Sequence, residues 1–226
     1  MQNIKVKQME ILLNEFHLLS KTVLTQLKIV EKLLQNNAIA SLYEEMEANE
    51  IIIDRLEVKI REEVVFAIFK FNPVAQDLRT IIAYQDMTTN LERIGDLVLN
   101  IGHRLKNEYL NEEDTSLMKN ELIKMVSLVH KMTSDALIAF ASQDATLAYD
   151  VIEKDDIADE MFRKNEIILV EKYANLPMKK EIISMIIDLS TISYNLERIG
   201  DNATNIAEAA VFIAEGKDIR HEQSKG

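Results

Sequence analysis

Residues 90–96 read Asn90-Leu-Glu-Arg-Ile-Gly-Asp96, and the same seven residues return as Asn195-Leu-Glu-Arg-Ile-Gly-Asp201. Chance does not place identical seven-residue strings 105 positions apart in a chain of 226 residues. A repeat of this kind indicates that the fold is built from two copies of one unit.

The composition around the repeat favours an all-α fold. The chain has only five glycines and two prolines, and its commonest residues are good helix formers. We predict six helices in two sets of three. Their expected ranges are residues 8–35, 39–71, 73–110, 114–142, 144–175 and 177–216.

Turn and capping residues set these boundaries. Asn72 is expected as an N-cap with Pro73 at the first helical position, and Pro177 is expected to open the matching helix. Asp114 and Asp144 are further expected N-caps, and Gly216 is a typical C-cap. Long helices joined by short turns pack as antiparallel neighbours. We therefore predict two tandem three-helix bundles, over residues 1–111 and 112–216, followed by a polar tail at 217–226.

The third helix of each set carries a heptad pattern of apolar residues, typical of a buried seam. In the first copy the pattern includes Tyr84, Leu91, Val98 and Leu105. Glu92, Asp96 and Asn100 occupy other heptad positions, as do Glu197, Asp201 and Asn205, so we expect these six residues to point outward. Gly95 and Gly200 interrupt these helices, which predicts a close approach by a neighbouring helix or a bound species.

Paired acids recur in both halves at helical spacing. Glu92 and Asp96 lie four residues apart, as do Glu50 and Asp54, and each pair returns 105 residues later. Residues four apart share one face of a helix, so adjacent helices would bring four carboxylates together. The candidate metal ligands are Glu50, Asp54, Glu92, Asp96 and Asn100 in the first half, and Asp155, Asp159, Glu197, Asp201 and Asn205 in the second.

Such oxygen-rich sites suit hard cations, namely Mg, Ca, Mn or Fe, and Zn also accepts carboxylates. A single acidic pair on a surface helix is usually only solvated, and it is the duplication in register that favours a divalent or trivalent metal ion. Arg93 and Arg198 are expected to pair with nearby acids.

The sequence has no motif of a catalytic site. A Glu-x-x-His pair, a glycine-rich phosphate loop and a nucleophile elbow are all missing from it. We expect a non-enzymatic protein with no catalytic residues. Two alternatives stay open: a metal-dependent hydrolase or oxidase that uses the carboxylate cluster, and a metal-free helical adaptor.

Charge and hydropathy exclude other classes of protein. A net charge of −12 disfavours nucleic-acid binding. The chain has no cysteine and no apolar run near the roughly 20 residues of a membrane span, and no signal-peptide pattern opens it. These features predict a cytoplasmic protein without membrane insertion.

The repeated motif resembles that of the PhoU family. Each copy is followed by Asn-Ile, at residues 100–101 and 205–206, and residues 73–79 resemble the family's turn into the third helix. The resemblance implies two repeated bundles with multinuclear iron or zinc clusters at the acidic pairs. It also implies a cytoplasmic negative regulator of phosphate uptake and phosphate-starvation signalling. Such a regulator contacts the ATPase subunit of the phosphate ABC transporter and a sensor histidine kinase at the membrane.

Some positions depart from the family pattern. Val98 stands where a small residue is usual, whereas Ala203 conforms, and residues 177–181 lack the motif of residues 75–79. We therefore expect the two metal sites to differ in affinity or nuclearity. We also expect a homodimer.

Overall fold

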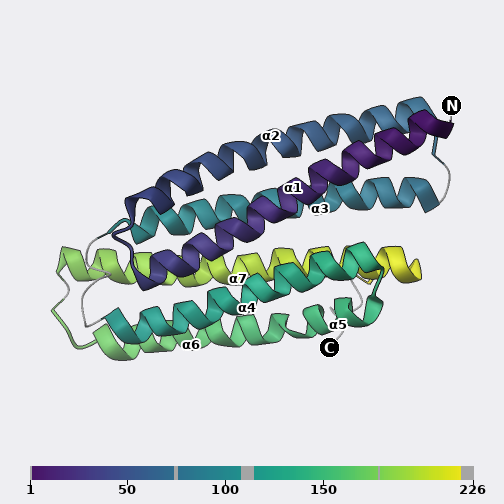
Figure 1. The fold of residues 1–226 in the computed structure, drawn as a ribbon. Coiled ribbons are helices and arrows are strands. Elements are labelled where there is room, and N and C mark those ends of the chain that lie inside the picture. Colours follow the sequence, from purple (N-terminus) through teal and green to yellow (C-terminus); the bar gives the residue numbers. More distant parts are fainter. Residues whose placement is uncertain (1, 74–75, 108–114, 178, 220–226) are drawn as a thin grey trace.

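A computed structural model describes residues 2–73, 76–107, 115–177 and 179–219 of the chain. These residues form α-helices and no β-strand (Figure 1). The helices are α1 (Gln2–Gln35), α2 (Ala40–Phe71), α3 (Gln76–Leu105), α4 (Ser116–Ser142), α5 (Ala145–Glu153), α6 (Asp155–Tyr173) and α7 (Lys180–Glu215).

The helices form two stacked bundles, as the repeat predicts. Helices α1, α2 and α3 make up the first bundle, and α4 to α7 make up the second. Figure 1 shows α3 and α7 side by side in the middle of the molecule, and α1 also contacts α4. The heptad seam is buried in both copies, with Leu91, Val98, Leu196 and Ala203 each fully inaccessible to solvent. The all-α prediction of two repeated bundles is confirmed.

The second helix of the second bundle is broken, although the sequence predicts one helix from 144 to 175. α5 ends and α6 begins around Lys154, whose N–H donates to the carbonyl of Val151 at 3.1 Å. The predicted N-cap at its start is confirmed, since the Asp144 carboxylate accepts a hydrogen bond from the Leu147 N–H at 3.1 Å. The break places Asp155 in the first turn of α6.

The predictions from Asn72 and the two prolines are wrong in detail. Asn72 is the C-cap of α2, in a left-handed conformation with φ 42°. Pro73 and Pro177 both lie outside the helices, so neither occupies the first helical position. α3 also ends at Leu105, before the predicted residue 110. Asn combines an amide side chain with tolerance of positive φ, so it suits either end of a helix.

The prediction for Gly216 is confirmed, because it caps α7 with φ 75°. The expected cap at Asp114, the boundary at 111–112 and most of the polar tail lie outside the described residues.

α3 and α7 run antiparallel across the centre of the molecule. The Arg79 guanidinium, early in α3, lies 5.2 Å from the centre of the Phe212 ring, late in α7. At the opposite end, Asp188 accepts hydrogen bonds from Arg104 Nη1 at 2.8 Å and from Asn107 Nδ2 at 2.7 Å. Because the two helices are equivalent parts of the repeat, their antiparallel packing relates the bundles by an approximate two-fold axis.

Candidate metal centres

The antiparallel packing of α2 and α3 brings the four acids of the first repeat together. Glu50 lies opposite Asp96, close enough for their side chains to share a proton, and Asp54 and Glu92 complete the group. Burial, and after it the repulsion between these carboxylates, raises the pKa of Glu50 and of Glu92. We name this group the first carboxylate site.

Glu50 is the buried member of the first carboxylate site, with 7% of its surface exposed. Burial, and then the nearby Asp96, raise the pKa of Glu50 to about 8. Its Oε2 atom is buried and has no hydrogen-bond partner. An unpartnered buried carboxylate oxygen among other acids is unfavourable, because burial of a charge costs free energy unless it is compensated.

The second carboxylate site lies between α6 and α7. One oxygen from each of Asp159, Glu197 and Asp201 lies within 4.8 Å of the others. Asp155, at the start of α6, accepts a hydrogen bond from the Thr204 hydroxyl at 3.1 Å. Burial raises the pKa of Glu197 to about 7, with Asp201 as the next cause. Glu197 Oε2 is again buried without a hydrogen-bond partner.

Two arginines form direct ion pairs with acids of the second site. Arg163 Nη2 lies 2.9 Å from Asp159 Oδ2, and Arg198 forms an ion pair with Asp201. The expected pairing of Arg198 is therefore confirmed. Its counterpart Arg93 forms no ion pair within 4.0 Å with any residue that the structure describes, but its charge opposes the rise in the pKa of Glu92.

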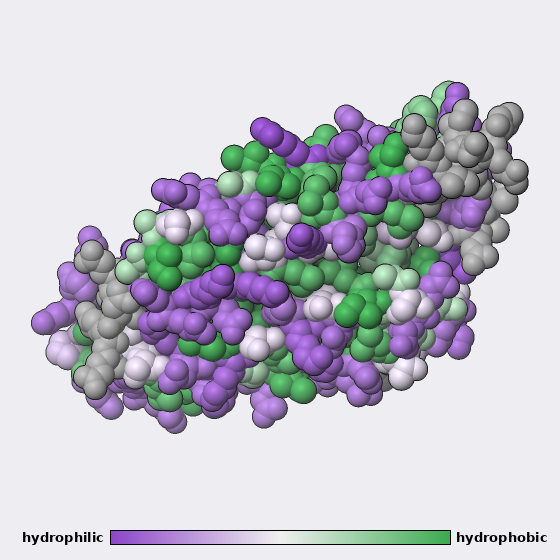
Figure 2. Space-filling view, in the orientation of Figure 1, coloured by the Kyte–Doolittle hydropathy of each residue, from purple (hydrophilic) through white to green (hydrophobic). Residues whose placement is uncertain are grey.

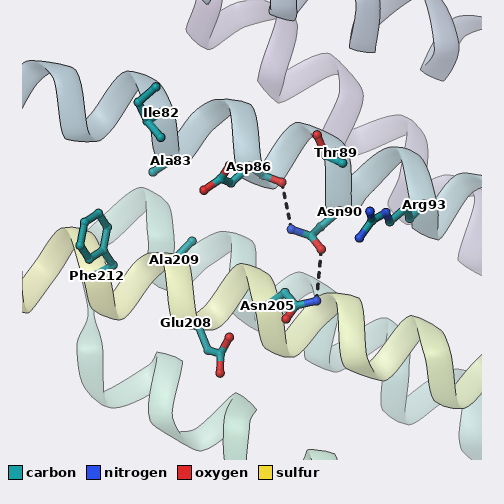
Figure 3. Close-up of a pocket in the computed structure, with 10 residues that line it drawn as sticks. All are labelled: Ile82, Ala83, Asp86, Thr89, Asn90, Arg93, Asn205, Glu208, Ala209 and Phe212. Atoms are coloured by element: carbon teal, nitrogen blue, oxygen red, sulfur yellow. Dashed lines mark hydrogen bonds between the residues drawn. The ribbon is translucent and has the colours of Figure 1, made fainter. Parts of the chain in front are cut away.

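Arg93 lies instead on a groove between α3 and α7 (Figure 3), which has a volume of about 440 Å³. Asn205 Nδ2 points across this groove and donates to Asn90 Oδ1 at 3.3 Å, and Asn90 Nδ2 donates to the carbonyl of Asp86 at 2.9 Å. Asn205 thus turns toward α3, while Asn100 is exposed. The role of both as metal ligands stays a prediction.

The two glycines of the repeat differ in their surroundings. A Cβ atom added to Gly95 would lie 3.1 Å from Ile53 Cδ1 and 3.2 Å from Glu50 Oε2, so the expected close approach is present there. At Gly200 the nearest atom is Ala158 Cβ at 3.4 Å, which is an ordinary contact. The glycine in the first repeat therefore makes room for the buried carboxylate.

The oxygen donors at both sites suit a hard or borderline cation, and each site holds one buried oxygen without a hydrogen-bond partner. Among the described residues, only Asp159, Glu197 and Asp201 bring three candidate ligand atoms within 4.8 Å of one another. Sequence reasoning missed Thr204 and Arg163 as members of the second site. The spacing of Asp159 and Arg163, four residues apart, was a visible signal for their ion pair. The contact of Thr204 with Asp155 depends on the packing of two helices and had no such signal.

No helix among the described residues is both long and apolar enough to cross a membrane.

Comparison with known proteins places the chain among close relatives. The family model described as the PhoU domain matches residues 16–105 and again 122–210. A phosphate-specific transport system accessory protein PhoU homolog 1 from Thermotoga maritima is 34% identical, over 91% of this chain and 90% of its own length. A PhoU homolog from Aquifex aeolicus is 33% identical, over 88% of this chain and 86% of its own. The crystal structure of PhoU from Pseudomonas aeruginosa matches with a TM-score of 0.86 at 29% identity, covering 93% of this chain and 99% of that one.

Proposed function

This chain belongs to the PhoU family, and from that premise we propose that it is a metal-binding negative regulator of phosphate uptake and phosphate-starvation signalling. It acts by contact with other proteins and not by catalysis. Its partners are the ATPase subunit of the phosphate ABC transporter and a sensor histidine kinase, so it works in the cytoplasm, at the inner face of the membrane. Support comes from relatives named as accessory proteins of a phosphate-specific transport system, which are similar over nearly the whole chain.

One observation carries the metal-binding part of the proposal. In each repeat, one carboxylate oxygen is buried among other acids without a hydrogen-bond partner, at Glu50 and at Glu197. A cation at that position compensates the buried charge and the repulsion between the neighbouring acids. The donor atoms suit iron or zinc, and also Mg, Mn or Ca.

The residues that would hold the cation come from two helices in each bundle. Glu50 and Asp54 on α2 face Glu92 and Asp96 on α3, and Asp155 and Asp159 on α6 face Glu197 and Asp201 on α7. A bound cation would lower the negative charge of that surface, and an interface that includes it becomes sensitive to metal and to salt.

Elemental analysis of protein purified without chelator tests metal binding. We expect at least one metal ion per chain, and we expect dialysis against chelator to remove it. Protein that carries no metal, and binds none of the candidate cations in a titration, would leave only the metal-free adaptor.

Phosphate uptake by a deletion strain tests the regulatory role. In phosphate-rich medium we expect uptake and a starvation reporter to rise above wild-type levels, and we expect the intact gene to restore both. Wild-type levels in a strain with no second copy of the gene would contradict the proposal.

A further inference from the structure

A second groove lies where the two bundles meet, between α1 and α4. It has a volume of about 650 Å³ and an aromatic floor contributed by three helices. The Tyr84 ring packs edge to face against Phe16 and Phe140, at centroid distances of 5.0 and 5.1 Å. Figure 2 shows apolar surface between α1 and α4, with hydrophilic side chains on both sides.

Apolar side chains at the rim of this groove remain exposed to solvent. Leu13 on α1 is 43% exposed and Ile138 on α4 is 53% exposed. Ser20, Thr25 and Ser134 are small polar residues of the lining. A hollow with an aromatic floor and an apolar rim suits an apolar occupant.

The charged side chains of the lining are basic. They are Lys21 and Lys28, with His17 beside them, and the described lining contains neither Asp nor Glu. None of the three forms an ion pair with a residue that the structure describes. Since the chain as a whole has a net charge of −12, this groove differs in sign from the average surface. An acidic partner is repelled by most of the molecule and attracted here.

The spacing of the lining residues gives the length of the occupant. On α1 they recur every three or four positions from Leu13 to Lys28, so they form one continuous stripe. The rise along α1 from Leu13 to Lys28, fifteen residues later, is about 22 Å, or roughly four helical turns. A partner helix of similar length can lie along this stripe with its apolar face on the aromatic floor, which is a common mode of peptide recognition.

We propose that the groove between α1 and α4 binds an acidic amphipathic helix of a partner protein. The helix inserts an apolar face between the rims formed by Leu13 and Ile138, and its carboxylates lie beside Lys21 and Lys28. This inference deepens the proposed function, because a regulator that acts by contact needs a docking surface, and it rests on that function for its biological meaning.

A synthetic peptide tests the groove directly on the full chain. The probe is an 18-residue labelled peptide with Leu and Phe on one helical face and Glu on the flanking faces. A control peptide keeps the apolar face and carries Lys in place of Glu. By fluorescence anisotropy we expect one acidic peptide to bind per groove, and the basic peptide to bind about tenfold more weakly or worse. Equal binding of both peptides would overturn the proposal.

Three variants locate the binding site. Lys21→Glu with Lys28→Glu should weaken the acidic peptide about tenfold or more, whereas Lys70→Glu with Lys180→Glu changes the net charge equally and should have little effect. The latter two lysines are exposed and lie outside the groove. Ala141→Trp should also block binding, by filling the groove without a change of charge. Circular dichroism confirms that each variant is folded.

Other occupants give different results. Loss of a dimer in the Ala141→Trp variant, without peptide binding to the wild type, would assign the groove to a second copy of the chain. Binding of dodecyl phosphate in preference to the peptide would assign it to an anionic amphiphile. Either result overturns the proposal.

The same variants separate this inference from the proposed function. If the deletion strain shows no phosphate phenotype, the proposed function fails whatever the peptide does. If the wild-type gene restores regulation and the Lys21→Glu, Lys28→Glu gene restores it equally well, the proposed function stands and the docking groove is wrong.

Discussion

The two carboxylate sites share their acidic ligands but differ in the residues around them. At the second site, Arg163 and Arg198 pair with two of the acids and Thr204 donates to a third. The positions equivalent to Arg163 and Thr204 in the first repeat hold Val58 and Leu99, and the counterpart of Arg198 turns to a groove. Two copies of one motif have thus diverged in charge compensation while the candidate ligands stayed acidic.

The broken helix adds to this difference. Asp155 lies in the first turn of α6, where the free backbone N–H groups of a helix favour negative charge. Its counterpart Glu50 lies inside α2, beyond the first turns of the helix, and is buried. The first site therefore has more uncompensated charge, and we expect it to depend more strongly on a bound cation than the second.

Removal of the ligands from one site should have the largest effect. Glu92→Ala with Asp96→Ala should remove metal from the first repeat only, and Glu197→Ala with Asp201→Ala from the second only. Metal content per chain, measured by elemental analysis, checks both. Glu44→Ala with Glu45→Ala removes two exposed acids outside the sites and serves as the control. An unchanged metal content after substitution of all four acidic pairs would disprove the metal sites.

The stability of the metal-free protein should fall as the pH rises. The pKa of Glu50 is raised from 4.5 to about 8 and that of Glu197 to about 7. Between pH 4.5 and those values the folded state binds more protons than the unfolded state, so the free energy of unfolding decreases with pH. We expect a loss of about 1–3 kcal/mol between pH 5 and 8.

Two variants assign this pH dependence to its site. Glu50→Gln should remove most of the decrease between pH 7 and 8, and Glu197→Gln should reduce it mainly at and below about pH 7. Urea denaturation of chelator-treated protein measures both, and a saturating cation should flatten the wild-type profile. Stability that increases from pH 5 to 8 in the metal-free protein would show that the buried acids are compensated in another way.

The two glycines should respond differently to alanine. Gly200→Ala should stabilise the protein by about 0.5–1 kcal/mol, because alanine is the better helix former and the nearest atom leaves room. Gly95→Ala should not increase the stability, because the new Cβ atom would lie too close to Glu50 and to the fully buried Ile53. Thermal melts measure the stability, and metal titration should show weaker binding at the first site for Gly95→Ala alone. Equal stabilisation by both changes would mean that Glu50 and Ile53 shift to accommodate the added methyl group without loss of stability.

The smallest expected effect comes from transfer of an arginine between the repeats. Val58→Arg places a cation four residues after Asp54, as Arg163 stands after Asp159. The half-exposed position tolerates the change, and the new ion pair should stabilise the metal-free protein by about 0.3–0.5 kcal/mol. Metal affinity at the first site should drop a few-fold, and Arg163→Val should raise affinity at the second. If titrations show the same metal affinity as the wild type for both variants, the arginine does not influence cation binding and this prediction is wrong.

Much of the fold was predictable because the repeat, the heptad seam and the caps at Asp144 and Gly216 are local patterns. The break at Lys154 was not, since the residues around it include no glycine or proline and have ordinary helical propensity. The break coincides with contacts to two other helices, from Lys154 to Asp135 and from Thr204 to Asp155. Asn72 was assigned to the wrong end of a helix because its chemistry suits both ends.

The convergence of four acids in each bundle could be predicted from spacing and antiparallel packing. The difference between the sites could not, because it depends on side chains from other turns. Thr204 on α7 reaches Asp155 on α6, and Arg93 lies on the groove between α3 and α7. Sequence periodicity gives the face of a helix but not which of several neighbours a long side chain will meet.

The two hydrogen bonds that Asp188 accepts occur on only one side of the molecule's approximate two-fold axis, and this asymmetry bears on its evolution. Asp188 joins Arg104 and Asn107 on one side of the approximate two-fold axis. On the other side of the axis, the equivalent residues line the groove between α3 and α7. They are Ala83, Ala209 and Phe212. In a symmetric dimer of separate bundles, every mutation would appear on both sides of the axis at once. In a single polypeptide that constraint is absent, so one side of the axis can hold the hydrogen bonds of Asp188 while the other side carries different residues.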